Sequence, residues 1–420
     1  MKLAPGTPLA IHLLTDEQAA PKAIGRLAMA GGFAQLEWSA EVIAEGLAIS
    51  PLRYPTEPGL HAASGQKFEG LHGFLSDCLP DAWGMLLLKR RLQSLGHRFE
   101  DLNAVDRLAL VGARGRGALV FQPEIMAEDI ADSIDLDRLS DESRHLLIGE
   151  ESELDALLLR LGGGSGGARP KVHVAIGDDG SLRAGDELAA DGGPRAAEQW
   201  IVKFAAINDP VDIGPLEEAY ARMARAAEIE MAETKLIPSA TGPGHFATRR
   251  FDRPAPGKRV HMVSLGGALE ASAHMPSVDY DGFLKATLAI TRSMADVEQA
   301  FRRMVFNVLA RNRDDHVRQH AYLMDPRGNW RLAPAFDLTY SNGPGGEHYM
   351  AVRGEGRTIT RAHVEKLGTS HGLSVKAIAA VINDVRAALA DWPVHARETG
   401  VTTSLAVISE GLASVAKHFD

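Results

Sequence analysis

Apolar residues in the first half of the chain form short runs that are separated by turns. Residues 1–125 combine such runs with single helical stretches, which is typical of a small α+β unit. Beyond it, the pattern predicts strands at 172–176 and 200–204 and a helix at 216–229. A further strand pair is expected around Arg250–Arg253. This half is therefore expected to be rich in sheet.

Helical spacing dominates from about Ser264 to the end of the chain. It predicts helices at 297–310, 375–389 and 405–419. The exception is a hairpin, in which 320–324 and 330–333 flank a Pro-Gly-Asn-rich turn. We therefore expect an α+β fold with two lobes, a mixed, sheet-rich N-terminal lobe and an all-helical C-terminal lobe. The expected domains are 1–125, 126–263 and 264–420.

Composition narrows the class of protein without naming a function. The chain has 420 residues, of which 45% are hydrophobic and 24% charged, as in an ordinary globular protein. No run approaches the roughly 18 to 20 apolar residues of a membrane span, and the start lacks the apolar segment of a signal peptide. We therefore expect a cytoplasmic protein without membrane contact.

The cysteine content and the net charge limit the chemistry further. Cys78 is the only cysteine, so an intrachain disulfide and a cysteine-based zinc site are both ruled out, and we expect it to be a buried apolar residue. The formal net charge of −10 argues against broad binding of nucleic-acid backbone. Contact with DNA is expected only through a partner.

The most informative polar residues lie between 307 and 337. Asp314 precedes the amide Gln319 by five residues, and Asp337 follows the hairpin. Protein kinases place a catalytic aspartate, a metal-binding amide and a second metal-binding aspartate in this order. We predict that Asp314 is the catalytic base, that His316 orients the catalytic loop, and that the hairpin brings Gln319 and Asp337 together. A solvated charged loop, or a metal-hydrolase site made of Asp314, Asp315 and His316, is the alternative.

Two further segments are candidates for binding a nucleotide. Five glycines between Gly162 and Gly167, followed by Lys171, could let backbone amides approach phosphate, although a flexible linker has the same composition. Lys203 interrupts an apolar strand, where an ammonium needs a partner. Glu217 or Glu218 at the start of the next helix could supply it, as in the lysine–glutamate pair of kinases. A solvent-facing Lys203 is the alternative.

Together these segments make the chain resemble the HipA family of bacterial serine/threonine kinases, the toxins of HipBA-type toxin–antitoxin systems. The motifs that carry the resemblance run over nearly the whole chain: Leu79-Pro80-Asp81-Ala82-Trp83-Gly84, Gly167-Ala168-Arg169-Pro170-Lys171, Trp200-Ile201-Val202-Lys203, Arg250-Phe251-Asp252-Arg253, Asn312-Arg313-Asp314-Asp315-His316 and Leu332-Ala333-Pro334-Ala335-Phe336-Asp337-Leu338. The resemblance implies a two-lobed kinase-like fold with ATP and Mg2+ between the lobes.

The resemblance also implies roles for individual residues and for partners. The residues implied in nucleotide binding are Ser165, Gly166, Gly167 and Ala168 in a phosphate loop, with Lys171, Lys203, Glu217 and the hinge residues Val263 and Leu265. Gln319 and Asp337 would bind metal. The implied partners are a small helix-turn-helix antitoxin of the HipB type, which would contact DNA, and a protein substrate such as an aminoacyl-tRNA synthetase. Phosphorylation of that substrate would arrest growth, as in persistence.

The sequence departs from the family pattern at two places. Gln319 stands where the family ordinarily has Asn, and a shift of about 1 Å in the ligand oxygen can cost about a hundredfold in rate. A pseudokinase or weak kinase that acts through nucleotide and antitoxin binding is therefore the alternative function. In the glycine loop, Gly164 stands where self-inactivating members have serine, and Ser165 follows it. Phosphorylation of Ser165 remains a hypothesis.

Overall fold

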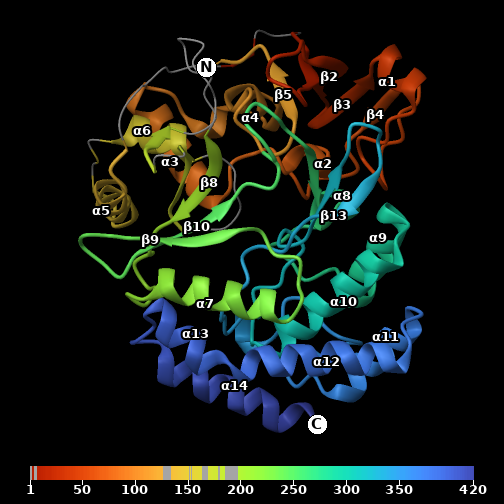
Figure 1. Cartoon of the computed structure of the whole chain (residues 1–420). Helices are drawn as coiled ribbons and strands as arrows, with labels where there is room; N and C mark the ends of the chain where they lie inside the picture. The colour runs from red at the N-terminus through yellow and green to blue at the C-terminus, as the bar shows by residue number, and fades with distance from the viewer. Residues whose placement is uncertain are drawn as a thin grey trace. The chain divides into compact units, whose positions relative to one another are not determined.

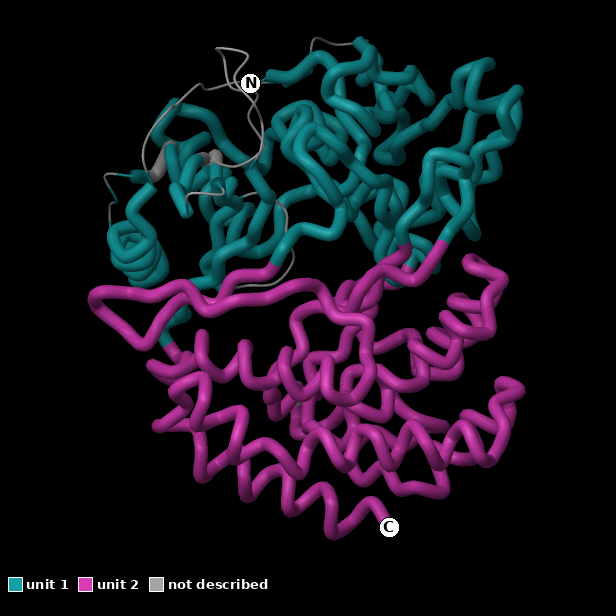
Figure 2. The backbone as a smooth tube through the Cα atoms, viewed as in Figure 1, with its two compact units in different colours: residues 1–207, 249–270, 323–330 teal, residues 208–248, 271–322, 331–420 magenta. Residues whose placement is uncertain are grey.

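The computed structural model divides the chain into two compact units. It describes residues 2–3, 7–125, 134–150, 152, 154–162, 169–177, 180–184 and 197–420. The first unit comprises residues 1–207, 249–270 and 323–330, and the second comprises 208–248, 271–322 and 331–420 (Figure 2). The predicted domain boundaries at 125 and 263 stay predictions, because these units are discontinuous in sequence.

A five-stranded antiparallel sheet forms the N-terminal part of the first unit (Figure 1). Its strand order is β4-β3-β2-β1-β5, from β1 (Leu9–Leu13), β2 (Lys22–Ala30), β3 (Phe33–Trp38), β4 (Leu60–Ala62) and β5 (Leu119–Gln122). Leu9, Ile11 and Leu13 alternate toward the interior, as the strand period requires. Helix α4 (Ala104–Val111), which is buried throughout, packs against β2 and β5. A small α+β unit was predicted here.

This part contains further helices, some of which begin with a side-chain cap. They are α1 (Ala40–Glu45), α2 (Gly73–Ser76), α3 (Ala82–Ser94), α5 (Leu136–Leu147) and α6 (Asp155–Leu161), with a 3-10 turn at Phe99–Asp101. Asp81 caps α3 by accepting from the Gly84 amide at 2.8 Å. Helix α3 contacts α6, which in turn contacts β6.

Three strands of a second sheet, whose order is β7-β6-β8-β10-β9, follow in the same unit. Strand β6 (Lys171–Ile176) is buried at every position and pairs antiparallel with β7 (Leu182–Ala184) and β8 (Glu198–Lys203). Strand β11 (His261–Ser264) leads directly into α8 (Leu265–Leu269). The strands predicted at 172–176 and 200–204 are therefore present, with shifted ends.

Helices make up most of the second unit. They are α7 (Ile213–Ala226), α9 (Tyr280–Thr291), α10 (Met294–Leu309), α11 (Arg361–Ser370), α12 (Val375–Ala390), α13 (Trp392–Thr399) and α14 (Leu405–Phe419). Strands β9 (Thr234–Ile237) and β10 (His245–Arg249) pair antiparallel. Helix α10 is buried on most of its surface and contacts α9, α12 and α14 (Figure 1). The predicted helical C-terminal part is confirmed.

Two details of the sequence prediction were wrong. The helix predicted at 216–229 runs from Ile213 to Ala226, because a proline is tolerated in the first turn and Glu228 takes a left-handed φ of 58° just past the end. The strands that flank Arg250–Arg253, β10 and β11, belong to different sheets and do not form the expected pair. Within the described residues, no helix is long and apolar enough to cross a membrane.

Candidate active site

The two adjacent aspartates of the predicted catalytic segment differ sharply in exposure. The segment follows α10, and Arg311 turns the chain with a left-handed φ of 54°. The side chain of Asp314 is 56% exposed, whereas Asp315 is fully buried. Of these two carboxylates, only that of Asp314 is accessible from solvent, and its role as catalytic base stays a prediction. Among the described residues, no group of three or more His, Cys, Asp or Glu side chains is arranged to hold a metal ion.

His316 lies against Asp314 in a defined orientation. Its Nδ1 atom accepts a hydrogen bond from the Arg318 amide at 3.2 Å, so the ring proton sits on Nε2. That Nε2 atom lies 3.9 Å from Oδ1 of Asp314. The ring also meets the edge of Tyr349, with the centroids 5.7 Å apart. The distance to Asp314 is longer than a hydrogen bond, and the orienting role of His316 stays a prediction.

Gln319 and Asp337 meet at the base of the hairpin. Strands β12 (Ala321–Met324) and β13 (Trp330–Leu332) lie between them and are neighbours in one sheet. The Gln319 Nε2 atom donates to Oδ2 of Asp337 at 2.8 Å, so the predicted convergence is confirmed. Asp337 holds a left-handed φ of 57°, and such conformations in residues other than glycine cluster at functional sites.

This pair fits a magnesium ion shared with a nucleotide. Mg2+ is ordinarily held by one or two protein oxygen ligands together with substrate phosphates. Asp337 offers a carboxylate, and rotation of the Gln319 amide would exchange its NH2 group for its carbonyl oxygen. Gln319 is only 9% exposed, so its reach is confined. The metal roles of both residues stay predictions.

Two lysines predicted to bind the nucleotide lie side by side in the first unit. Lys171 on β6 is directly opposite Lys203 on β8, so both side chains leave the same face of the sheet. Lys171 is buried and forms an ion pair with Asp81 at 3.2 Å. The role of both lysines in phosphate binding stays a prediction.

The structure describes only some of the other residues that were predicted to bind the nucleotide. Ser165, Gly166, Gly167 and Ala168 lie outside the described residues. Glu217 and Glu218 on α7 are both buried, but Glu218 accepts from Arg222 at 2.9 Å and from Arg225 at 3.4 Å. Glu217 therefore stays the candidate for pairing with Lys203, as a prediction.

The predicted adenine hinge is anchored by an aspartate that the sequence analysis did not single out. Val263 and Leu265 are fully buried and flank Ser264, the residue that caps α8. Asp77 accepts hydrogen bonds from both the amide and the hydroxyl of Ser264, each at 2.7 Å. The hinge is therefore fixed from the side of α2, and its role in adenine binding stays a prediction.

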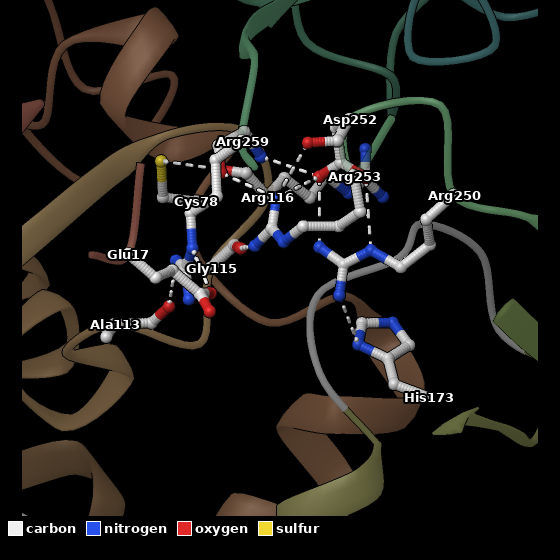
Figure 3. A network of polar contacts seen from close by, with 11 residues as sticks. Glu17, Cys78, Ala113, Gly115, Arg116, His173, Arg250, Asp252, Arg253 and Arg259 are labelled. Carbon is white, nitrogen blue, oxygen red and sulfur yellow. Dashed lines mark hydrogen bonds and ion pairs between the residues drawn. The ribbon is translucent and has the colours of Figure 1, made fainter. Parts of the chain in front are cut away.

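The motif around Asp252 forms a buried charge network in the first unit (Figure 3). Asp252 accepts from Arg250 at 3.0 and 2.9 Å, from Arg253 at 2.9 Å and from the Gly117 amide at 2.9 Å. Burial alone would raise the pKa of Asp252, but the two guanidinium groups lower it below its usual range. Arg253 also donates to the Gly117 carbonyl at 2.8 Å. The network joins the loop before β5 to the chain after β10.

Arg250 and Cys78 extend this network at its two ends. Arg250 contacts Nδ1 of His173 on β6 at 3.1 Å. The thiol of Cys78 lies 3.9 Å from the Arg116 carbonyl and is buried, which raises its pKa (Figure 3). Cys78 is a free, buried cysteine, as predicted.

Comparison with models of known protein families shows to which family the chain belongs. The sequence model described as HipA-like C-terminal domain matches residues 163–392, which is more than half of the chain. The chain belongs to the HipA family. The HipA N-terminal domain matches as well, over residues 19–122. The predicted family is therefore confirmed, and both HipA-type regions are present in one chain.

Individual relatives agree with this assignment. A Haemophilus influenzae protein named "Putative kinase" is 26% identical over 135 residues, which cover 29% of this chain and 39% of that protein. The Sinorhizobium fredii "Putative kinase Y4dM" is 29% identical over 154 residues, covering 33% of this chain and 36% of that protein. The chain thus matches less than two-fifths of the length of either relative.

A solved structure shares the fold over almost the whole chain. It is HipA from the Shewanella oneidensis MR-1 complex of HipA, HipB and operator DNA, with a TM-score of 0.70 and 18% identity over 97% of this chain and 96% of that one. At this identity the likeness establishes the fold alone. The predicted α+β architecture, with a sheet-rich N-terminal region and a helical C-terminal part, is confirmed.

Proposed function

We propose that this HipA-family protein is a serine/threonine protein kinase that uses ATP and Mg2+. The observation that carries the proposal is the arrangement in the second unit: an exposed Asp314 whose neighbour Asp315 is buried, and Gln319 in contact with Asp337 at 2.8 Å. A catalytic carboxylate and a metal-binding pair in this order are the parts that phosphoryl transfer requires.

The residues of this chain supply positioning and charge for the transfer. The hydroxyl oxygen of the protein substrate forms a bond to the γ-phosphorus, the bond from that phosphorus to the bridging oxygen breaks, and ADP leaves. Asp314 takes the hydroxyl proton, and His316 keeps Asp314 oriented. When bound, Mg2+ neutralises charge on the phosphates, with Asp337 and Gln319 as its protein ligands.

The nucleotide itself is assigned to residues of the first unit and the start of α7. Lys203, with Lys171 opposite to it, would attract the phosphates, and Glu217 would hold Lys203. Val263 and Leu265 would flank the adenine. The two lysines lie on one face of the sheet, and the phosphate assignment rests on the family to which the segments that carry them belong.

The family also suggests a biological setting. The Shewanella oneidensis structure contains HipA together with HipB and operator DNA. By extension we propose that this chain is a cytoplasmic toxin that arrests growth by phosphorylating a protein, possible targets including an aminoacyl-tRNA synthetase, and that a small helix-turn-helix antitoxin binds it. The net charge of −10 is consistent with DNA contact through that antitoxin.

Transfer of labelled γ-phosphate from ATP tests the proposal. The native chain and Glu410→Ala, which removes an exposed carboxylate on α14, should transfer phosphate equally well, whereas Asp314→Ala should lose transfer and keep ATP binding. A native chain that binds ATP but shows no Asp314-dependent transfer would support the second candidate function, a pseudokinase, which the Gln319 substitution motivates.

A further inference from the structure

Asp315, the buried neighbour of the catalytic base, receives an unusual number of hydrogen bonds. Its carboxylate accepts from the Tyr280 hydroxyl at 2.6 Å, from Nδ1 of His348 at 2.9 Å, and from the amides of Tyr349 at 2.7 Å and Met350 at 3.4 Å. Burial alone would raise the pKa of Asp315, but these donors lower it below its usual range. The group is therefore a fully satisfied buried carboxylate.

The donors come from two segments that are remote in sequence. Tyr280 opens α9, and residues 348–350 follow Asp337 in the chain. The Tyr280 amide also donates to the carbonyl of Ala351 at 3.0 Å, so these two segments hold each other as well. Asp315 thus joins the catalytic loop to a segment beyond the metal-binding aspartate.

Two asparagines close the network into a ring. The Asn312 side chain donates to Asn307 at 2.9 Å, and Asn307 donates to the Tyr280 hydroxyl at 2.9 Å. Tyr280 then donates to Asp315, three residues after Asn312. The loop that carries Asp314 is therefore held on both sides by buried hydrogen bonds.

Such a network can replace a covalent switch. In many protein kinases, the segment that follows the second metal-binding aspartate becomes ordered only when a phosphate on it pairs with arginine. In this chain the buried Asp315 carboxylate holds that segment through two backbone amides and His348. Hydrogen bonds to a charged group are stronger than those between neutral groups, so four of them can fix a loop.

We propose that Asp315 is a positioning residue that clamps the catalytic loop to residues 348–350, so that Asp314 is held in its working position without phosphorylation of residues 338–360. This inference rests on the proposed kinase function. It assigns no contact with substrate to Asp315, which acts through the loop that carries Asp314.

Paired tyrosine variants test the clamp against a loss of general stability. Tyr280 and Tyr322 are both fully buried, but the Tyr322 hydroxyl contacts Thr287 at 2.9 Å and lies outside the network. Tyr280→Phe should lower kcat about tenfold, whereas Tyr322→Phe should leave it within about twofold. Asp315→Ala should lower kcat about a hundredfold, because displacement of the base by about 1 Å has that effect.

Comparing the change in kcat with the change in KM for ATP shows whether a variant affects the position of Asp314 or the binding of the nucleotide. The residues assigned to ATP lie outside the clamp, so KM for ATP should change by less than about threefold in every variant. Asp315→Asn keeps an acceptor oxygen for the Tyr349 amide and should retain more activity than Asp315→Ala. Phosphatase treatment of the native chain should leave kcat unchanged.

Hydrogen exchange tests the clamp without requiring that the chain be catalytically active. The amides of Tyr349 and Met350 should exchange slowly in the native chain and faster in Tyr280→Phe and Asp315→Asn, but not in Tyr322→Phe. Equal kcat and equal exchange in the two tyrosine variants, or loss of activity on phosphatase treatment, would overturn the clamp. A native chain that transfers no phosphate would defeat the proposed function, and hydrogen exchange would still decide whether Asp315 holds the two segments.

Discussion

The buried ion pair between Lys171 and Asp81 offers a sharp test of how the first unit is held together. The pair joins the start of β6 to the start of α3, and each side chain is only 3% exposed. Trp83 reinforces the connection by donating to the Lys171 carbonyl at 3.1 Å. Asp81→Asn removes the charge but keeps a side-chain oxygen for the Gly84 amide, so α3 should keep its cap.

The size of the effect follows from the burial of the lysine. Removing one partner from a buried ion pair costs about 3–5 kcal/mol, because the remaining buried charge loses compensation. The loss of stability has an upper bound, because Lys171 can release its proton instead of staying charged without Asp81. Neutralising a lysine with an ordinary pKa of about 10.4 costs about 4.6 kcal/mol at pH 7. We therefore expect Asp81→Asn to lower the free energy of unfolding of the first unit by about 3–4.6 kcal/mol.

A double variant shows whether the charge is the cause. Asp81→Asn with Lys171→Met removes both charges and keeps the volume of the lysine stem, so stability should return to within about 1.5 kcal/mol of the native value. Hydrogen exchange of the β6 amides in urea is the suitable measurement, because a chain with two compact units need not unfold in one step. A loss below about 1 kcal/mol in Asp81→Asn, or no recovery in the double variant, would refute this reasoning.

Three more predictions concern the metal pair, the hinge and pH. Gln319→Asn should raise kcat by up to about a hundredfold in the phosphate-transfer assay, and an unchanged rate would show that the longer amide already reaches the metal. Asp77→Ala should raise the Kd for ATP about tenfold in a titration, because it releases the hinge, and an unchanged Kd would count against the hinge assignment. Burial lowers the pKa of His72 and His261 to about 4 and that of His320 to about 3. These folded-state values lie below the unfolded value, so stability is complete above about pH 6.5 and falls by about 1.4 kcal/mol per pH unit for each histidine below it. The Tm should therefore drop between pH 7.5 and pH 5, and a constant Tm would contradict the assignment.

The parts of the site that depend on local spacing could be predicted from the sequence. The hairpin turn and its apolar flanks predict that Gln319 and Asp337 converge, and the structure confirms a direct contact between them. Helical periodicity likewise predicts the helix Leu405–Phe419 with correct ends. Both features follow from the short-range geometry of helices and hairpins.

The parts that depend on distant residues could not be predicted in this way. Asp314 and Asp315 are adjacent and of the same residue type. Asp315 is the buried one because Tyr280 and His348, which are distant in sequence, pack against it and donate hydrogen bonds to it. Lys171 was predicted to bind phosphate, but its partner Asp81 lies 90 residues away, at a separation where spacing carries no signal.

Buried charges were a second source of missing detail. Arginines are ordinarily exposed, so the sequence gives no reason to place Arg250 and Arg253 in the interior. In the structure each is 3% exposed: Asp252 pairs with both guanidinium groups, His173 contacts Arg250, and backbone carbonyls accept from Arg253. The same network explains why the strands beside these residues do not pair with each other: the chain between them turns into the interior.

The most direct test of the kinase assignment is to identify which cellular protein gains phosphate when this chain is produced. Phosphopeptide mass spectrometry should compare cells that produce the native chain with cells that produce Asp314→Ala at the same level. We predict that at least one protein gains phosphate on serine or threonine with the native chain only. Identical phosphopeptides in both samples, from a native chain that is folded and binds ATP, would contradict the assignment of this chain as a protein kinase.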